Sequence, residues 1–400
     1  MKNKILKKIN PNIFLFGIAS FLNDFSSEMI TPILPMFIES LGGGGIIIGL
    51  IGGARDSISN LLKVVFGYWS DKIGKRKIFI FLGYLNSAAF KLLLAFSQVW
   101  QQVLIICGFE RIGKGLRTAP RDAAISEFMP THKGKAFGIH RTFDTAGAIA
   151  GSFIVFLLFW LYKSNFKTII FIAALLSFLS LIPLIFIKEK KKKVAPIKKT
   201  THVKFADLQK PLKTFIFISG IFGMGNFSYM FFILRAQKLF SGAFAISMPI
   251  LLYVFFNIFY ATFAIPFGVL ADKIGKKKII ALGFFTYSLT TLGFAFFNNF
   301  ISFIFLFALY GLACSMIEAN RRALVSELST EKTRGTALGI FHTTIGLAAL
   351  FSSLIAGFLW QKTTPKFTFI YASVLTFFAA ILLITFFSKK ESNKELRIEK

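Results

Sequence analysis

The fold is decided by a charged stretch, Gly67-Tyr-Trp-Ser-Asp71-Lys-Ile-Gly74-Lys75-Arg76, that lies between two long apolar runs. The stretch returns 201 positions later as Gly268-Val-Leu-Ala-Asp272-Lys-Ile-Gly275-Lys276-Lys277, again between apolar runs. One such string in a soluble protein would carry little information. Two copies at matching places in two hydrophobic halves indicate a duplicated membrane transporter.

The composition is that of an integral membrane protein. Of the 400 residues, 55% are hydrophobic and 16% are charged, whereas an ordinary globular domain carries about 25% charged residues. A soluble protein this apolar would expose large adhesive patches. Runs such as Thr168–Ile187 and Phe367–Phe387 approach the roughly 20 apolar residues that a spanning helix needs.

Twelve membrane spans are predicted, with approximate bounds 12–38, 45–69, 77–96, 99–119, 137–161, 168–187, 212–238, 247–270, 279–297, 300–320, 336–360 and 367–388. Lysine and arginine gather in alternate connections, among them the N-terminal lysines at positions 2, 4, 7 and 8. The positive-inside rule then places both termini in the cytoplasm, which requires an even number of spans. Topology therefore explains the net charge of +29, and no nucleic-acid partner is expected.

We predict an all-α integral membrane protein of twelve transmembrane helices in two pseudo-symmetric six-helix bundles. The predicted parts are an N-terminal bundle (1–187), a basic cytoplasmic linker (188–211), a C-terminal bundle (212–388) and a cytoplasmic tail (389–400). Beyond the charged stretch, Ala124-Ile-Ser-Glu127 matches Leu324-Val-Ser-Glu327, and Trp160 matches Trp360. Parallel six-span halves with a site between them are an established transporter plan.

Four motifs resemble those of one transporter family, the major facilitator superfamily, and the resemblance covers essentially the whole chain. The repeated stretch is similar to that family's signature between helices 2 and 3 and between helices 8 and 9. Pro32-Ile-Leu-Pro35 and Arg111-Ile-Gly-Lys114-Gly115 are similar to the P-x-x-P and R-x-x-Q-G motifs of the twelve-span drug:proton antiporter branch, with Lys114 in place of Gln. Helix five has the antiporter glycine spacing at positions 138, 147 and 151, but Ser152 stands where that motif has proline, and its closing Gly-Gly is absent.

The resemblance implies a gating role for the repeated stretch. Asp71 and Asp272 would latch the two bundles while the cytoplasmic side is closed, and the glycines would let neighbouring helices approach closely. The alternative is a charged turn that only sets topology. The candidate gating residues are Gly67, Asp71, Gly74, Lys75, Arg76, Gly268, Asp272, Gly275, Lys276 and Lys277.

Ionisable residues at membrane depth are the second functional signal, because a charge at the helix centre costs roughly 3 kcal/mol or more. At about 1.5 Å per residue, Asp24 lies roughly 18 Å from the cytoplasmic face. By the same rise, Arg55, Asp56, Glu110 and Arg111 lie roughly 14–17 Å from the other face. The second half has neutral or aromatic residues at the matching places, so we expect the first half to handle protons and charged substrate groups. The second half would supply an apolar wall from Phe222, Phe227, Tyr229, Phe256 and Tyr310.

The candidate proton-coupling residues are Asp24, Glu28 and Glu110, with Arg111 beside them. A carboxylate next to a buried cation can exchange protons, because burial favours its neutral form and the cation its charged form. The alternative is a static ion pair of Asp24 with Arg55 or Arg111. For Lys63 and Lys91, extension of the side chain to the membrane interface explains their presence as well as a function does. The candidate substrate-cavity residues are Arg55, Asp56, Lys114, Arg117, Asp144, Asn226, Tyr229, Asn257 and Tyr310.

The function that these residues predict is secondary active transport of a small organic solute by alternating access, with proton-coupled efflux preferred. The alternative is proton-linked uptake or exchange of an organic anion, such as a carboxylate metabolite or a siderophore. Enzyme classes are not supported, since the sequence has no P-loop and no zinc-ligand spacing. No cofactor and no metal are expected; the expected partners are the lipid bilayer, protons and a small-molecule substrate. We expect a monomer in a bacterial inner membrane.

Overall fold

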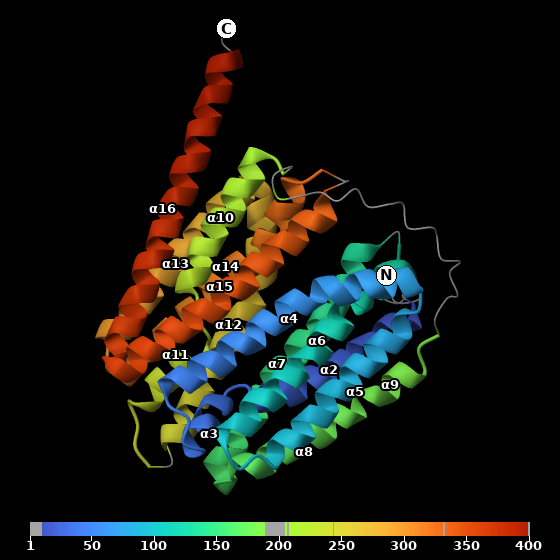
Figure 1. Cartoon of the computed structure of the whole chain (residues 1–400), viewed down its shortest axis with the longest axis vertical. Coiled ribbons are helices and arrows are strands. Elements are labelled where there is room, and N and C mark those ends of the chain that lie inside the picture. The colour runs from blue at the N-terminus through green and yellow to red at the C-terminus, as the bar shows by residue number, and fades with distance from the viewer. Residues whose placement is uncertain are drawn as a thin grey trace, which may run out of the picture. The chain divides into compact units, whose positions relative to one another are not determined.

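The computed structural model describes residues 10–130, 132–188, 205, 208–242, 244–330 and 333–398, without the side chains of 133 and 387–398. The N-terminal lysines and nearly all of the predicted basic linker lie outside these residues. The described chain is helical throughout its long elements, as predicted (Figure 1). The helices of the first half of the sequence are α2 (Pro11–Ile30), α3 (Leu34–Ser40), α4 (Gly45–Ile73), α5 (Arg76–Ala95), α6 (Trp100–Phe128), α7 (Lys133–Tyr162), α8 (Phe166–Leu179) and α9 (Leu181–Ile185).

The second half repeats this order. Its helices are α10 (Lys210–Gly225), α11 (Met230–Gln237), α12 (Phe244–Ile274), α13 (Lys276–Phe296), α14 (Phe300–Glu327), α15 (Arg334–Lys362) and α16 (Pro365–Ile398). When α2 is read with α3, α8 with α9, and α10 with α11, the described helices correspond one by one to the twelve predicted spans. Ten of these stretches are long and apolar enough to cross a membrane. The other two, α4 and α6, are 29 residues long and carry several charged residues within their length.

Two of the helix breaks can be related to particular residues. At the break between α2 and α3, Pro32 lacks the backbone N–H that a continuous helix requires, and Pro35 stands in the first turn of α3. Between α10 and α11 the freed backbone groups find side-chain partners: the Ser228 N–H donates to Ser353 Oγ (3.0 Å), and the Tyr371 hydroxyl donates to the Met224 carbonyl (2.7 Å). Such replacement partners make a broken helix tolerable at membrane depth.

By its contacts the chain divides into two compact units. Unit 1 comprises residues 1–43, 54–200 and 240–251, and unit 2 comprises residues 44–53, 201–239 and 252–400. The two units are therefore not two continuous stretches of sequence, because each includes a short segment from the other half. The beginning of α4 is counted with unit 2, and the beginning of α12 is counted with unit 1.

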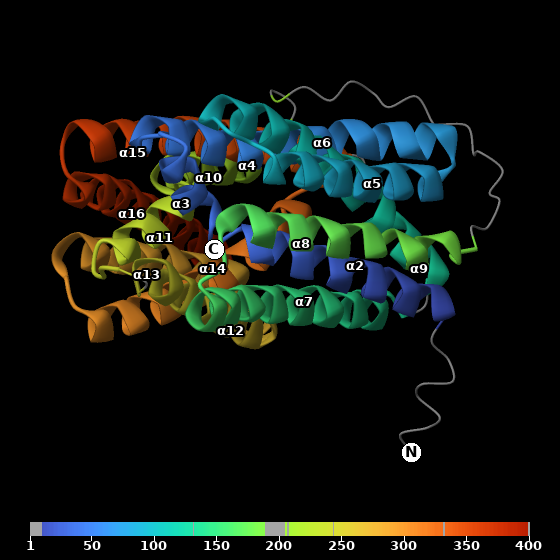
Figure 2. The same ribbon diagram turned by 90° about the horizontal axis from the view of Figure 1, so that it is seen from below.

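In unit 1, α2 packs between α7 and α8 (Figure 2). The contact with α7 is close because α7 has glycines where α2 crosses it. A Cβ atom at Gly147 would stand 2.5 Å from the Phe21 carbonyl oxygen, and one at Gly151 would stand 2.2 Å from the Phe25 carbonyl oxygen. These glycines of the antiporter-like spacing therefore serve helix packing, whereas a Cβ at Gly138 would meet no described atom within 4 Å.

In unit 2, α13 packs against α14 and α16, and α10 against α16 (Figure 1). The interior is an aromatic cluster centred on Phe232 of α11, which is fully buried. Its ring stacks on Tyr310 (centroids 4.3 Å apart) and meets Phe294 edge-on at 5.1 Å. Aromatic burial is thus the main packing device of this unit.

Candidate functional site

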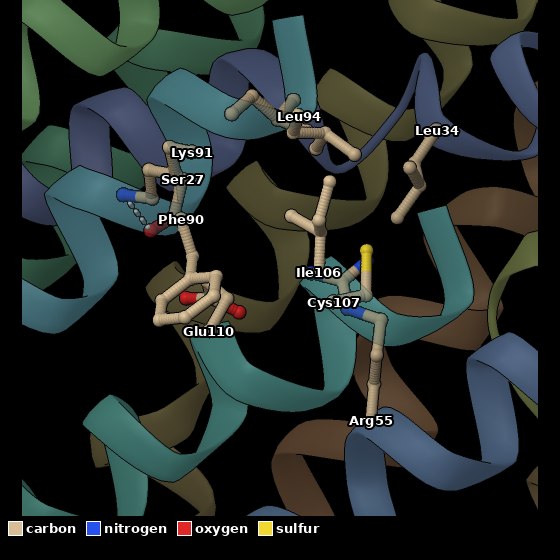
Figure 3. Close-up of a pocket in the computed structure, with 10 residues that line it drawn as sticks. Ser27, Leu34, Arg55, Phe90, Lys91, Leu94, Ile106, Cys107 and Glu110 are labelled. Carbon is tan, nitrogen blue, oxygen red and sulfur yellow. Dashed lines mark hydrogen bonds between the residues drawn. The ribbon is translucent and has the colours of Figure 1, made fainter. Parts of the chain in front are cut away.

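A small pocket lies inside unit 1 (Figure 3). It combines an apolar wall with three charged side chains, a mixture that small-molecule sites also have. Helices α2 and α3 supply Ser27, Ile30 and Leu34; α4 supplies Arg55; α5 supplies Phe90, Lys91 and Leu94; and α6 supplies Ile106, Cys107 and Glu110.

Glu110 is the buried carboxylate of this pocket, with 9% of its surface exposed. Its Oε2 atom lies 3.3 Å from Nε of Arg111, and its Oε1 atom accepts a hydrogen bond from Ser87 Oγ at 3.3 Å. On α4, Arg55 extends toward Cys107 and brings a second guanidinium to the same pocket (Figure 3). The structure therefore brings together three of the predicted residues, Arg55, Glu110 and Arg111.

Lys91 is more deeply buried than its sequence position indicates. Its side chain is 3% exposed and does not extend to the membrane interface. It turns inward, where its Nζ atom contacts oxygens of α2 and α8 and where it also lines the pocket. No local sequence signal marks this contact, because the partner oxygens lie 64 to 86 positions away in the chain.

A second polar centre in unit 1 joins α2 to α7 and α6. Ser20 Oγ donates a short hydrogen bond to Asp144, and it accepts one from Arg121 at 3.2 Å. Asp144 also lies 3.9 Å from His140 Nε2 and 3.9 Å from an Nη atom of Arg141. The predicted residue Asp144 is therefore held by partners from α2 and from its own helix.

Asp24 lies on α2 and is half-buried. Its Oδ1 atom accepts a hydrogen bond from Asn23 Nδ2 at 3.1 Å. The charged groups whose field acts on it are Asp144, Lys114, Arg117 and Arg121. The proposed static partner Arg111 is instead ion-paired with Glu110.

Other predicted residues of the first half lie outside the pocket lining. Arg117 is 4% exposed and faces α5, where it donates to Ser87 Oγ (2.6 Å) and lies over the Tyr84 ring at 4.6 Å. This contact joins α5 to α6. Glu28, Asp56 and Lys114 are half-buried on α2, α4 and α6.

The predicted aromatic residues of the second half lie in unit 2. Tyr310 stacks between Phe232 and Phe256, with the second pair of centroids 4.5 Å apart, and Tyr229 packs against Tyr253. Asn257 is 7% exposed, and Asn226 is half-buried in the break before α11. The predicted apolar wall therefore consists of residues that largely pack on one another.

The second half has neutral residues at the matching places, but it also holds buried arginines, Arg235 of α11 and Arg321 of α14. Arg321 of α14 is 3% exposed, pairs with Glu318 at 2.9 Å, and lies over the Phe222 ring at 5.3 Å. The predicted span ends at residue 320, whereas α14 continues to Glu327. The internal repeat could have indicated a second deep arginine, since Arg321 stands 200 positions after Arg121, close to the spacing at which the two halves match.

The two repeated stretches have the same internal network. Arg76 bridges Asp71 (2.9 Å) and Glu127 (3.2 Å) in unit 1, and Lys276 bridges Asp272 (2.8 Å) and Glu327 (3.5 Å) in unit 2. Each stretch therefore ties the end of one helix to the end of α6 or α14. Lys75 and Lys277 flank these bridges.

The glycines of the two stretches differ in their roles. Gly74 (φ +71°) and Gly275 (φ +103°) turn the chain in conformations that L side chains rarely adopt. Gly67 permits close approach, since a Cβ there would stand 3.1 Å from Ala119 Cβ. Close helix approach was also expected at Gly268, but this expectation was wrong, since a Cβ there would meet no described atom within 4 Å.

Comparison with known proteins identifies the family. The family model described as Major Facilitator Superfamily matches residues 16–250 and again residues 215–400. The chain belongs to the major facilitator superfamily. Because this is a family of transporters, the chain is a multi-pass membrane transporter of small molecules and not an enzyme.

Individual proteins are also similar to this chain in sequence or in structure. An uncharacterized MFS-type transporter of Methanocaldococcus jannaschii is 53% identical over 381 residues, which cover 94% of this chain and 95% of the relative. The multi-drug resistance efflux pump PmrA of Streptococcus pneumoniae is 31% identical over 126 residues, 32% of this chain and 31% of the pump. The crystal structure of the nucleoside transporter NupG superposes with a TM-score of 0.78 at 16% identity, covering 94% of this chain and 99% of that chain.

Proposed function

We propose that this superfamily member is a proton-coupled transporter of a small organic solute. The observation that carries the proposal is the buried Glu110–Arg111 pair at the edge of a mixed polar and apolar pocket. A carboxylate in such a place can bind a proton when its cation turns to a substrate, and release it when the cation returns. Asp24, with Asp144 nearby, is the second proposed proton carrier, and Glu28 the third.

Export is the preferred direction. Two features support it: the P-x-x-P motif at the break between α2 and α3 together with the R-x-x-Q-G-like motif of α6, and the similarity of about a third of the chain to a multi-drug efflux pump. Uptake or exchange of an organic anion is the alternative. The pocket favours this alternative, because Arg55 and Lys91 bring two cations to it against the single carboxylate of Glu110.

The remaining parts of the proposal concern topology and gating. The distribution of lysine and arginine supports the cytoplasmic membrane of a prokaryote with both termini in the cytoplasm. The Arg76 and Lys276 networks are proposed to regulate the rate of the transport cycle. We further propose that the protein works as a monomer.

The test uses the full chain in liposomes that contain a pH dye. Organic cations, neutral drugs and organic anions are each imposed on either side of the membrane. Proton movement opposite to a cation or neutral drug, and lost in Asp24→Asn or Glu110→Gln, supports efflux. Proton movement together with an anion, lost when Arg111 is replaced, favours the uptake alternative.

Glu318→Gln is the control for this assay, because it breaks a Glu–Arg pair in unit 2 whose glutamate side chain is 46% exposed, against 11% for Glu110. It should leave proton coupling intact. Full coupling in both Asp24→Asn and Glu110→Gln would sink the assignment of proton transfer to unit 1.

A further inference from the structure

The side chain of Lys91 ends in a cluster of oxygen atoms. Its Nζ atom lies 2.9 Å from Ser27 Oγ, 3.0 Å from Ser26 Oγ, 3.3 Å from Ser177 Oγ and 3.4 Å from the Asn23 carbonyl oxygen. We call these four oxygens the oxygen cage. Three of them belong to α2 and one to α8, so the ammonium of α5 is held between two other helices (Figure 3 shows the Ser27 contact).

The cage has the chemistry of a cation site. Ser26 donates its hydroxyl hydrogen to the Ala173 carbonyl at 2.5 Å, which leaves its lone pairs for the ammonium. The ammonium group of Lys91 has three hydrogens, yet four oxygens surround it. One residue of the cage also has an acceptor to spare, because Asn23 is 1% exposed and its Oδ1 atom has no hydrogen-bond partner among the described residues. Neutral oxygen ligands in excess of hydrogens suit a spherical cation as well as they suit a lysine.

The Lys91 ammonium group can also lie in the pocket. Lys91 and Ser27 line the pocket, and Glu110 of α6 lines the same pocket. The four-carbon stem of lysine is flexible, so the ammonium can turn from the cage toward an anion in the pocket. Glu110 and Asp24 attract the ammonium, and Arg111 and Arg117 repel it, so a new negative charge in the pocket would change the balance.

We propose that the oxygen cage is a binding site for a monovalent cation of ammonium size, either ammonium or potassium, in competition with the Lys91 side chain. The lysine fills the site while no anionic ligand is bound in the pocket. When an anionic group draws Lys91 into the pocket, the cage becomes free for the ion. Because coupling between two binding sites is reciprocal, the cation and the anion then strengthen each other's binding.

The test measures binding of the ion to the full chain. Wild type, Lys91→Ala and Lys63→Ala are purified in choline chloride, and potassium or ammonium chloride is added at constant ionic strength while melting is followed by tryptophan fluorescence. Lys91→Ala should gain a saturable rise in melting temperature, since at ten times Kd the folding constant increases about 11-fold. Wild type should show no such rise. Lys63→Ala is the matched control, because Lys63 Nζ contacts Asn60 Oδ1 at 3.2 Å on its own helix and lies outside the cage.

Further variants show whether the ion binds in the cage. Adding Ser177→Ala to Lys91→Ala should weaken the ion, and an unchanged affinity would place the ion elsewhere and refute the proposal. An equal rise in wild type or in Lys63→Ala would also refute it. If Lys91→Ala folds only in potassium or ammonium, the cage is supported; if it folds in neither ion, the proposal fails. None of these readouts depends on transport, so they remain separate from the function proposed above.

Discussion

Replacement of Gly151 by alanine should loosen α7 from α2. The added Cβ would stand 2.2 Å from the Phe25 carbonyl oxygen, whereas ordinary contact begins at 3.4 Å. The two helices must therefore separate by about 1 Å, or the carbonyl must tilt by as much. Overpacking of this kind costs about 1–3 kcal/mol. Alanine in a helix interior recovers about 0.5–1 kcal/mol relative to glycine, so the net destabilisation is about 0–2.5 kcal/mol, with a midpoint of about 1 kcal/mol.

The assay is the apparent melting midpoint of the full chain in detergent, compared with that of Gly138→Ala. Gly138 lies on the same helix, but a Cβ there meets no described atom within 4 Å, so this variant should equal or slightly exceed wild type. Gly147→Ala should lie between the two, since its Cβ would stand 2.5 Å from the Phe21 carbonyl oxygen. If Gly151→Ala is as stable as Gly138→Ala, the glycines of α7 are not there for packing against α2.

Two further predictions concern the repeated stretch. Asp71→Ala and Glu127→Gln each remove one partner of Arg76, and both should slow transport without changing substrate selectivity. The free energy of unfolding should change by less than about 1 kcal/mol, because the carboxylates are partly or largely exposed. Normal transport rates at normal expression would contradict a gating role. Gly275→Ala should lose about 1–3 kcal/mol because its φ of +103° strains an L residue, whereas Gly268→Ala should not, and equal melting midpoints for the two would argue against backbone strain at Gly275.

The fold was predictable because each span is an apolar run long enough to cross a membrane. Charge asymmetry and the repeated stretch then fixed the number of spans and their pairing into halves. The breaks inside spans were less accessible. Pro32 and Pro35 were noted as a motif without the break they cause, and the break at Asn226 has no proline at all, since it depends on partners such as Ser353 from a distant helix.

The candidate site was predicted in part. Glu110, Arg111 and Arg55 were identified because charges are rare in apolar spans. In the structure Glu110 and Arg55 line one pocket, and Arg111 pairs with Glu110. Lys91 was not, because depth estimated from a span boundary does not say which way a long side chain turns. Arg321 was missed for a related reason: the apolar run ends before the helix does, so a buried arginine was assigned to a loop.

The exchange of residues 44–53 and 240–251 between the two units has a consequence for hybrid proteins. Gly49 sits so tightly on α15 that a Cβ there would stand 2.1 Å from the Ser353 carbonyl oxygen, and a Cβ at Gly357 would meet the Gly45 carbonyl at 2.4 Å. A chimera that joins this N-terminal half to the C-terminal half of a relative would set these glycines against a foreign helix. The natural cutting points for recombination therefore lie inside α4 and α12 as well as at the linker.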